Sequence, residues 1–188
     1  MIYLIGINHD IQIGQVDGKR SQAFESLLGD LISDFNIKYV VEEWSDEASK
    51  IWKVESSKVK RVINEVEKKL EIKINHIYVD PDRRERKENN IKEEKDLVEQ
   101  HGWKGIILSG EQKWVIEEEM REEHRKRESM WLKKLALMIS DSDIIFICGT
   151  KHISDFNKVR GDGFDTLLAK SGYEVEVIDK RFDEWFET

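Results

Sequence analysis

Two histidines of this chain follow a glycine by three positions, and each of these Gly-x-x-His turns closes a short apolar run. Gly6 and His9 come after the run IYLI. Gly149 and His152 come after the run IIFIC. With 11 glycines in 188 residues, any one histidine has roughly a one-in-seventeen chance of such a glycine. Imidazoles bind divalent metals and exchange protons near neutral pH, so the two turns are the first candidates for chemistry.

Charged side chains follow the other apolar runs. Glu42 and Glu43 come directly after IKYVV, and Arg83 follows HIYVDPD. Because the carboxyl ends of parallel strands meet at one edge of an α/β sheet, we expect these groups to face the same crevice as the histidines. Two imidazoles and a carboxylate can hold a catalytic divalent metal with an open water position. The same groups could instead act without metal, with a histidine or glutamate as general base for water.

The two adjacent glutamates cannot both reach the histidines from a regular strand, because successive side chains point to opposite faces. We therefore expect one of Glu42 and Glu43 to lie among the histidines, unless a bulge turns both inward. The other would orient a neighbour, contact a helix or face solvent. His76, His101 and His124 lack the Gly-x-x-His setting, and we interpret them as structural or solvent-facing.

Apolar runs alternate with helical patterns along the chain, which predicts an α/β fold with a mostly parallel or mixed central sheet flanked by helices. The expected strands cover 2–6, 37–41, 72–79, 144–148 and 173–178. The expected helices cover 20–34, 46–70 with an interruption near Ser57, 89–101, 110–139 and the segment FDTLLAKS. Cys148 falls inside an expected buried strand, so we interpret it as an inert core thiol.

The absence of a long flexible linker predicts a single domain over 1–188, with a helical insert around 85–140. The middle of the long helix, 117–128, is polar on every face. Such a segment is either solvated or lines a polar cavity. The charged tail contains Trp185 and Phe186 and follows the last expected strand.

The composition excludes several classes of protein. A net charge of −8 argues against a nucleic-acid partner, because phosphate binding needs basic surface. No apolar run approaches the roughly 20 residues that span a bilayer, so we expect no membrane partner. A single cysteine fits a reducing compartment, and the N-terminus carries no recognisable signal peptide. We therefore expect a cytoplasmic protein.

The two ends of the chain echo each other beyond the histidines. FESLL at 24–28 follows the first histidine turn, and FDTLL at 164–168 follows the second. A repeat of this kind would place the two turns side by side at one sheet edge. The alternative is that amphipathic helices often look alike.

These motifs, in this order, resemble the Tiki/TraB superfamily, which has TraB/PrgY-type proteins as members and erythromycin esterases and ChaN-like iron or haem proteins as distant relatives. The similarity lies in the two Gly-x-x-His turns, the Glu42-Glu43 pair and Asp82-Arg83. Further similar elements are the Arg-Glu-Ser-Met element that begins at Arg127 and the ending GTKH…FDTLLAKSGYEVEVI. The resemblance implies a Tiki/TraB-like core and a metal-dependent hydrolase of peptide or ester bonds.

On this interpretation a divalent metal, with Mn, Zn, Co or Fe all compatible, would be held by His9, Glu43 and His152. Without metal, the same three residues would activate water. Glu42 would act as base or orient its neighbours, and Arg83 and Arg127 would stabilise negative charge that develops on a peptide or small-molecule substrate.

Two other functions stay open from the sequence. The first is a non-catalytic module that binds a ligand or a partner protein, with the charged helix at 110–128 as its working surface and an exposed Trp114 in its favour. The second is iron or haem binding, which a visible absorption band would reveal.

Overall fold

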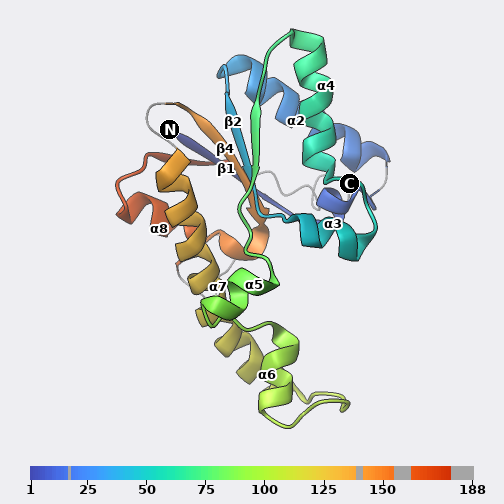
Figure 1. The fold of residues 1–188 in the computed structure, drawn as a ribbon, viewed down its shortest axis with the longest axis vertical. Helices are drawn as coiled ribbons and strands as arrows, with labels where there is room; N and C mark the ends of the chain where they lie inside the picture. The colour runs from blue at the N-terminus through green and yellow to red at the C-terminus, as the bar shows by residue number, and fades with distance from the viewer. Residues whose placement is uncertain (17, 139–141, 155–161, 179–188) are drawn as a thin grey trace.

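The computed structural model describes residues 1–16, 18–138, 142–154 and 162–178. It is an α/β fold in which five parallel strands form one sheet with helices on both faces (Figure 1). The strand order across the sheet is β3-β2-β4-β1-β5. The strands are β1 Ile2–Ile7, β2 Tyr39–Glu42, β3 Asn75–Tyr78, β4 Ile144–Gly149 and β5 Val175–Ile178. Every expected strand is confirmed, and the sheet is parallel throughout the described residues.

The helices fill the connections between these strands. Near the N-terminus they are α1 His9–Ile13, α2 Gly18–Asp34, α3 Asp46–Trp52 and α4 Lys58–Leu70. After β3 follow α5 Arg83–Glu88, α6 Glu94–Gln100 and α7 Gly110–Met138, and after β4 follow the short 3-10 helix η1 Thr150–His152 and α8 Phe164–Lys170. Ser57 caps α4, so the expected interruption of that helical stretch is confirmed.

The central strands β1 and β4 are buried along their whole length because helices cover both of their faces. Successive side chains of each strand therefore enter two separate cores. Ile5 and Ile147 pack with α2 and α4 on one face. Leu4 and Phe146 pack with α7 and α8 on the other face. Continuous isoleucine-rich runs are the sequence pattern that such two-sided burial requires.

The chain leaves β1 and β4 in opposite directions across the sheet. From β1 it passes β4 to reach β2, and from β4 it passes β1 to reach β5. Because connections between parallel strands are right-handed, α2 and α8 cover opposite faces. Phe24 of α2 lies in one core and Phe164 of α8 in the other. Open α/β sheets bind ligands at such a switch point, beyond the carboxyl ends of the two strands.

The segment after β3 differs from the expected single helix over 89–101. Asp82 and Glu85 form a capping box that starts α5 at Arg83, and Asn90 has a φ of +52° between α5 and α6. The helical structure therefore begins six residues before the expected start and is divided into two helices. Residues 9–13, which lie outside the expected strands and helices, form α1. Trp185 and Phe186 lie outside the described residues.

Helix α6 and the first half of α7 project away from the sheet (Figure 1). We call this projection, residues 94–120, the arm. The second half of α7 returns to the sheet, where Trp131 and Leu135 are fully buried. Among the described helices, none combines the length and the apolar character that crossing a bilayer requires.

Candidate active site at the switch point

The two Gly-x-x-His turns lie side by side, because β1 and β4 are neighbours in register. Gly6 pairs with Cys148, and Ile7 pairs with Gly149. Both histidines therefore leave the sheet at the same edge, at the point where the chain direction switches. The arrangement suggested by the sequence echo is confirmed.

Each turn's glycine makes room for the other turn. A Cβ on Gly149 would lie 3.3 Å from Nε2 of His9 and 3.4 Å from Oε2 of Glu43. A Cβ on Gly6 would lie 2.6 Å from Cδ1 of Ile153 and 3.4 Å from Cα of Thr150. The shortest contact at each glycine, 3.3 Å at Gly149 and 2.6 Å at Gly6, is closer than ordinary side-chain packing. The close approach of the two turns favours glycine at both positions, whereas their backbones, which are not left-handed, do not require it.

His9 is the exposed member of the site, at the first position of α1. Its Nδ1 lies 2.6 Å from Oε1 of Gln12, one helical turn later. Nε2 of Gln12 donates to Oε1 of Glu42 at 2.9 Å and to the backbone oxygen of Glu43 at 3.1 Å. Because both partners are acceptors, the amide orientation of Gln12 is fixed, and Nδ1 of His9 must carry the proton that its oxygen accepts. In the neutral ring, Nε2 then keeps the free lone pair.

The two adjacent glutamates point in different directions, as expected for an extended strand end. Glu42 is completely buried, on the side of α1 and α4. Its Oε1 accepts from Gln12, and its Oε2 accepts from Oγ of Ser57 at 2.7 Å and lies 3.0 Å from Nε2 of His76. Glu42 therefore orients Gln12 and does not reach the histidine turns itself. His76 has a structural role as one of its partners.

Glu43 joins the second histidine turn to α7. Its Oε2 accepts the backbone N–H of Gly149 at 2.7 Å, and its Oε1 accepts from Nη2 of Arg127 at 2.6 Å. Nε2 of His152 lies 3.4 Å from the same Oε1. Burial alone would raise the pKa of Glu43, but the charges of His152 and Arg127 outweigh it and hold that pKa well below its usual value. Glu43 is thus an ionised, buried carboxylate.

His152 is buried between two carboxylates, with only 2% of the residue exposed. Its Nδ1 lies 2.7 Å from Oε1 of Glu128, and Trp131 and His124 pack against its ring. Burial alone would lower the pKa of His152, but Glu43 and Glu128 together raise it. The imidazolium form of His152 is therefore favoured. Because His152 is buried and His9 is exposed, a substrate would reach His9 more easily.

Arg127 neutralises two carboxylates from two different strands. Besides Glu43, it binds Oδ1 of Asp80 through Nε at 3.0 Å and Nη2 at 2.7 Å. The other oxygen of Asp80 accepts from Nη2 of Arg86 at 2.6 Å. Arg83 does not join this cluster. Its side chain is 65% exposed and pairs with Glu47. Of the two predicted arginines, the structure brings only Arg127 to the histidines and glutamates.

The predicted metal ligands are neighbours, since His9 and Glu43 both lie against Gly149 and His152 lies 3.4 Å from Glu43. The carboxylate of Glu43, however, already has other partners. Both of its oxygens are bound, one to a guanidinium whose positive charge opposes a cation at the same atom. Within the described ranges, no group of three or more His, Cys, Asp or Glu side chains is placed to hold a metal ion. Nε2 of His9 suits a metal by chemistry, since a partner holds its Nδ1. Nε2 of His152 faces Glu43 in a ring that favours the protonated form, and the carboxylate does not fit as it lies.

Three contributors were not among the predicted site residues. Gln12 lies one turn after His9, in a helix of five residues that is too short to show a periodic pattern. Glu128 follows the predicted Arg127. It lies in the segment 117–128, for which the sequence allowed either a solvated helix or the lining of a polar cavity. Asp80 was visible as a strand-end carboxylate. Cys148 is fully buried, and burial raises the pKa of its thiol, which agrees with an inert core residue.

Comparison of the chain with protein-family models, with curated proteins and with solved structures found no match. The resemblance to the Tiki/TraB superfamily therefore rests on the motifs quoted above and stays a prediction. The arguments about chemistry that follow rest on the geometry at the switch point.

Proposed function

We propose that the protein is a hydrolase of peptide or ester bonds, and that His9 is its general base. The observation that carries this proposal is the path from Glu42 through Gln12 to His9. It fixes the ring orientation and tautomer of an exposed histidine and leaves the Nε2 lone pair for a water molecule. A histidine held in this way by a second and a third group is the usual arrangement of a catalytic base.

In the proposed reaction, Nε2 of His9 takes a proton from water while the water oxygen attacks the carbonyl carbon of the substrate. The new carbon–oxygen bond gives a tetrahedral intermediate. His9 then returns the proton to the departing alcohol or amine as the old bond breaks. Glu43, ionised and close to His9 around Gly149, stabilises the transient imidazolium.

The other charged residues have supporting roles in this proposal. Arg127 and His152 hold the Glu43 carboxylate in place and keep it ionised. Since the guanidinium of Arg127 already binds Glu43 and Asp80, we assign it to positioning Glu43 and not to the substrate. Glu42 positions Gln12, which is the orienting role considered for it from the sequence.

The test is a panel of chromogenic esters and fluorogenic peptides, assayed with the wild-type chain and His9→Ala. We expect His9→Ala to lower turnover of any cleaved substrate by at least about a hundredfold. The matched control is His101→Ala, because His101 pairs with Glu119 in the arm, away from the switch point. The proposal is overturned if the wild type cleaves nothing, or if His9→Ala cleaves as fast as the control.

A divalent metal at His9, Glu43 and His152 remains a separate prediction from the resemblance. Metal binding by Glu43 would first require Arg127 to release Oε1. Elemental analysis of the purified protein, followed by assays after chelation and after addition of Mn²⁺, Zn²⁺, Co²⁺ or Fe²⁺, tests it. Unchanged turnover after chelation would exclude a metal requirement and would leave His9 as the general base. A visible absorption band would instead favour iron or haem.

One observation favours partner binding as a second candidate function. Trp114 is 59% exposed, and Ile107 near the tip of the arm is 96% exposed. Large apolar side chains at the end of a projecting element are typical of contact surfaces. Replacing both with serine would abolish such binding and leave hydrolysis unchanged, so the two functions can be separated.

A further inference from the structure

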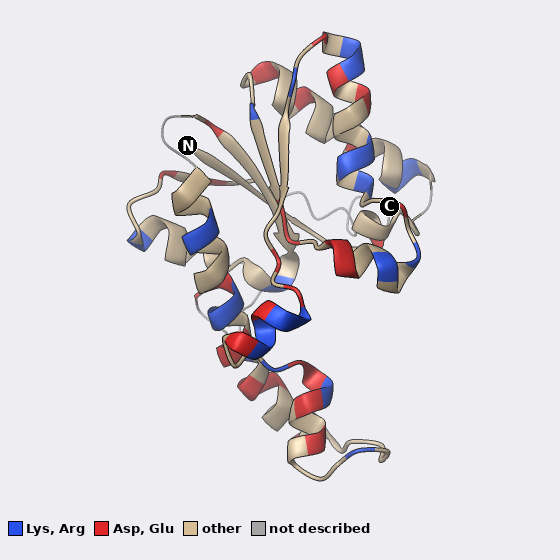
Figure 2. Cartoon of the chain, in the orientation of Figure 1, with Lys and Arg blue, Asp and Glu red and all other residues tan. Residues whose placement is uncertain are grey.

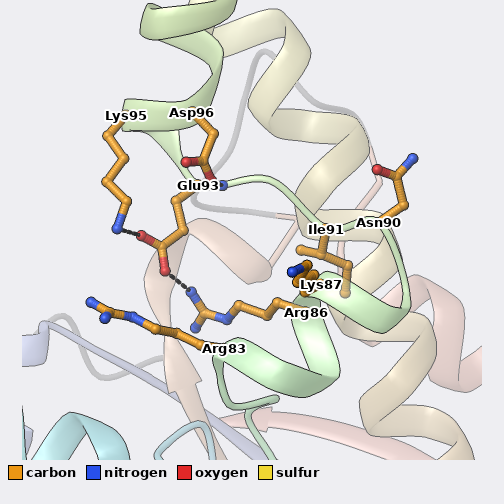
Figure 3. A pocket seen from close by; sticks show the side chains of 8 residues that line it. All are labelled: Arg83, Arg86, Lys87, Asn90, Ile91, Glu93, Lys95 and Asp96. Atoms are coloured by element: carbon orange, nitrogen blue, oxygen red, sulfur yellow. Dashed lines mark hydrogen bonds and ion pairs between the residues drawn. The ribbon is translucent and has the colours of Figure 1, made fainter.

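A cavity lies between α5 and α6, apart from the switch point. Its volume is about 400 Å³, which is in the range of small-molecule sites. Figure 3 shows side chains from both helices and from the loop between them around it. The lining residues are Arg83, Arg86, Lys87, Asn90, Ile91, Glu93, Lys95 and Asp96.

The lining of this cavity is basic, although the chain as a whole is acidic. Four cationic and two acidic side chains line it, for a formal charge of +2 within a chain of −8. Basic residues gather on α5, next to the acidic residues of α6 and of the first half of α7 (Figure 2). An anion near α5 would therefore meet a local field opposite to that of the neighbouring surface.

Two of the four cations are already paired inside the cavity. Glu93 binds Nη1 of Arg86 at 3.0 Å and also pairs with Lys95, as Figure 3 shows. The remaining two are Arg83, which uses its Nε for Glu47, and Lys87, which makes no ion pair with any described residue. The Nη groups of Arg83 and the ammonium of Lys87 are thus the donors left for a ligand.

We propose that this cavity binds a small molecule that carries a phosphoryl group. A guanidinium presents a fork of N–H donors that matches phosphoryl oxygens, and a lysine adds a second point charge. Buried Ile91 supplies an apolar wall and Asn90 an amide for the rest of the ligand. This assigns to Arg83 a binding role in a second site and does not depend on the proposed hydrolysis.

The cavity is connected to the switch point through one carboxylate. Arg86 in the cavity wall donates to Oδ2 of Asp80 at 2.6 Å. Oδ1 of Asp80 accepts from Arg127 and from Nε1 of Trp131, the latter at 3.3 Å. An anion that binds Arg86, or that competes with Glu93 for it, weakens the hydrogen bond from Arg86 to Asp80 and so changes the electrostatic environment of that carboxylate. The indole N–H of Trp131 therefore reports on ligand in the cavity.

The experiment is a titration of the full chain with inorganic phosphate and with phenyl phosphate, at constant ionic strength. Calorimetry measures affinity, and the indole N–H resonance of Trp131, assigned with Trp131→Phe, measures the connection. We expect saturable binding with a Kd of about 1 mM or tighter, and a shift of the Trp131 resonance. Binding of phosphate but not of phenyl phosphate would overturn the assignment of Ile91 and Asn90 to the rest of a ligand and leave a site for the free anion alone.

Matched variants locate the binding. Arg83→Ala and Lys87→Ala are each expected to weaken phosphate binding by at least about tenfold, because each removes a charge-assisted contact. Arg84→Ala is the control, since Arg84 is 81% exposed on the same helix and does not line the cavity. Equal weakening by Arg84→Ala, or no saturable binding to the wild type, would overturn the proposal. If phosphate binds saturably and the Trp131 resonance does not shift, the proposed connection between the cavity and Asp80 is overturned.

Discussion

His9 and Glu42 never touch, yet Glu42 fixes the orientation of His9 through the side-chain amide of Gln12. The amide lies 2.6 Å from Nδ1 of His9 and 2.9 Å from Oε1 of Glu42. The exposed end of this path is the imidazole, and its buried end is a carboxylate with no exposed surface. The path gives a direct test of whether the orientation of His9 matters for function.

Gln12→Leu breaks this path while keeping a side chain of similar size. We expect turnover of the identified substrate to fall by about tenfold to a hundredfold, because the ring loses its fixed tautomer. Stability is expected to fall by about 1–3 kcal/mol, since buried Glu42 loses a donor. Turnover numbers and urea denaturation measure the two effects. Gln15→Leu, an exposed glutamine after the same helix, is the control, and a loss of the same size there would contradict the assignment.

Arg127→Met leaves Glu43 and Asp80 without their shared cation. Because removal of one partner leaves buried charge uncompensated, we expect a loss of about 3 kcal/mol or more in the free energy of unfolding. Arg125→Met, two residues earlier on the same helix, removes an exposed guanidinium and is expected to cost less than about 1 kcal/mol. Urea denaturation of both variants measures the difference, and equal losses would show that the buried pairing contributes little.

The fold was predictable where burial leaves a simple pattern. Strands covered on both faces must be apolar at every position, so β1 and β4 were visible as continuous runs that end in Gly6 and Gly149. The order of the strands was not visible, because parallel pairing leaves no local signal. Helix α5 was missed because its six residues, RRERKE, include no apolar side chain that could show a helical pattern.

The site was predictable at the strand ends and not on the helices. His9, Glu43 and His152 follow apolar runs, so the sheet alone places them at one edge. Glu128 lies in a helix with charges on every face, where no pattern distinguishes the buried position from the exposed ones. Arg83 was the predicted arginine because it follows Asp82 after the third strand, whereas it is the rotation of α5 that turns Arg86 toward Asp80.

Glu43 and His152 predict a dependence of stability on pH. The lowered pKa of Glu43 means that its stabilisation is present above 4.5, its ordinary value, and is lost as the pH falls through the folded-state pKa. The raised pKa of His152 means that its stabilisation is present below 6.5, its ordinary value, and is lost as the pH rises through the folded-state pKa. Stability from this pair is therefore greatest between these two ordinary values.

Glu43→Gln removes the carboxylate whose own pKa is lowered and which helps to raise the pKa of His152. We expect the variant to be less stable and its free energy of unfolding to vary less between about pH 4 and pH 8 than that of the wild type. Glu117→Gln, an exposed carboxylate on α7, is the control and is expected to follow the wild-type profile. If the Glu43→Gln profile is parallel to that of the wild type, the two groups are not coupled in this way.

Gly149→Ala tests the close approach of the two histidine turns. The added methyl would lie 3.3 Å from Nε2 of His9 and 3.4 Å from Oε2 of Glu43, so both side chains must shift by a few tenths of an ångström. We expect the variant to fold and its turnover to fall by about tenfold or more, because a catalytic base depends on its position.

Gly29→Ala is the matched control, because Gly29 lies inside helix α2 and its Cβ would meet only Cγ2 of Val66 at an ordinary 3.7 Å. This substitution is expected to stabilise the protein by about 0.5–1 kcal/mol without changing turnover. Turnover and urea denaturation of both alanine variants separate crowding at the site from a general effect of replacing glycine. Full turnover in Gly149→Ala would mean that the position of His9 next to Glu43 is not used in catalysis.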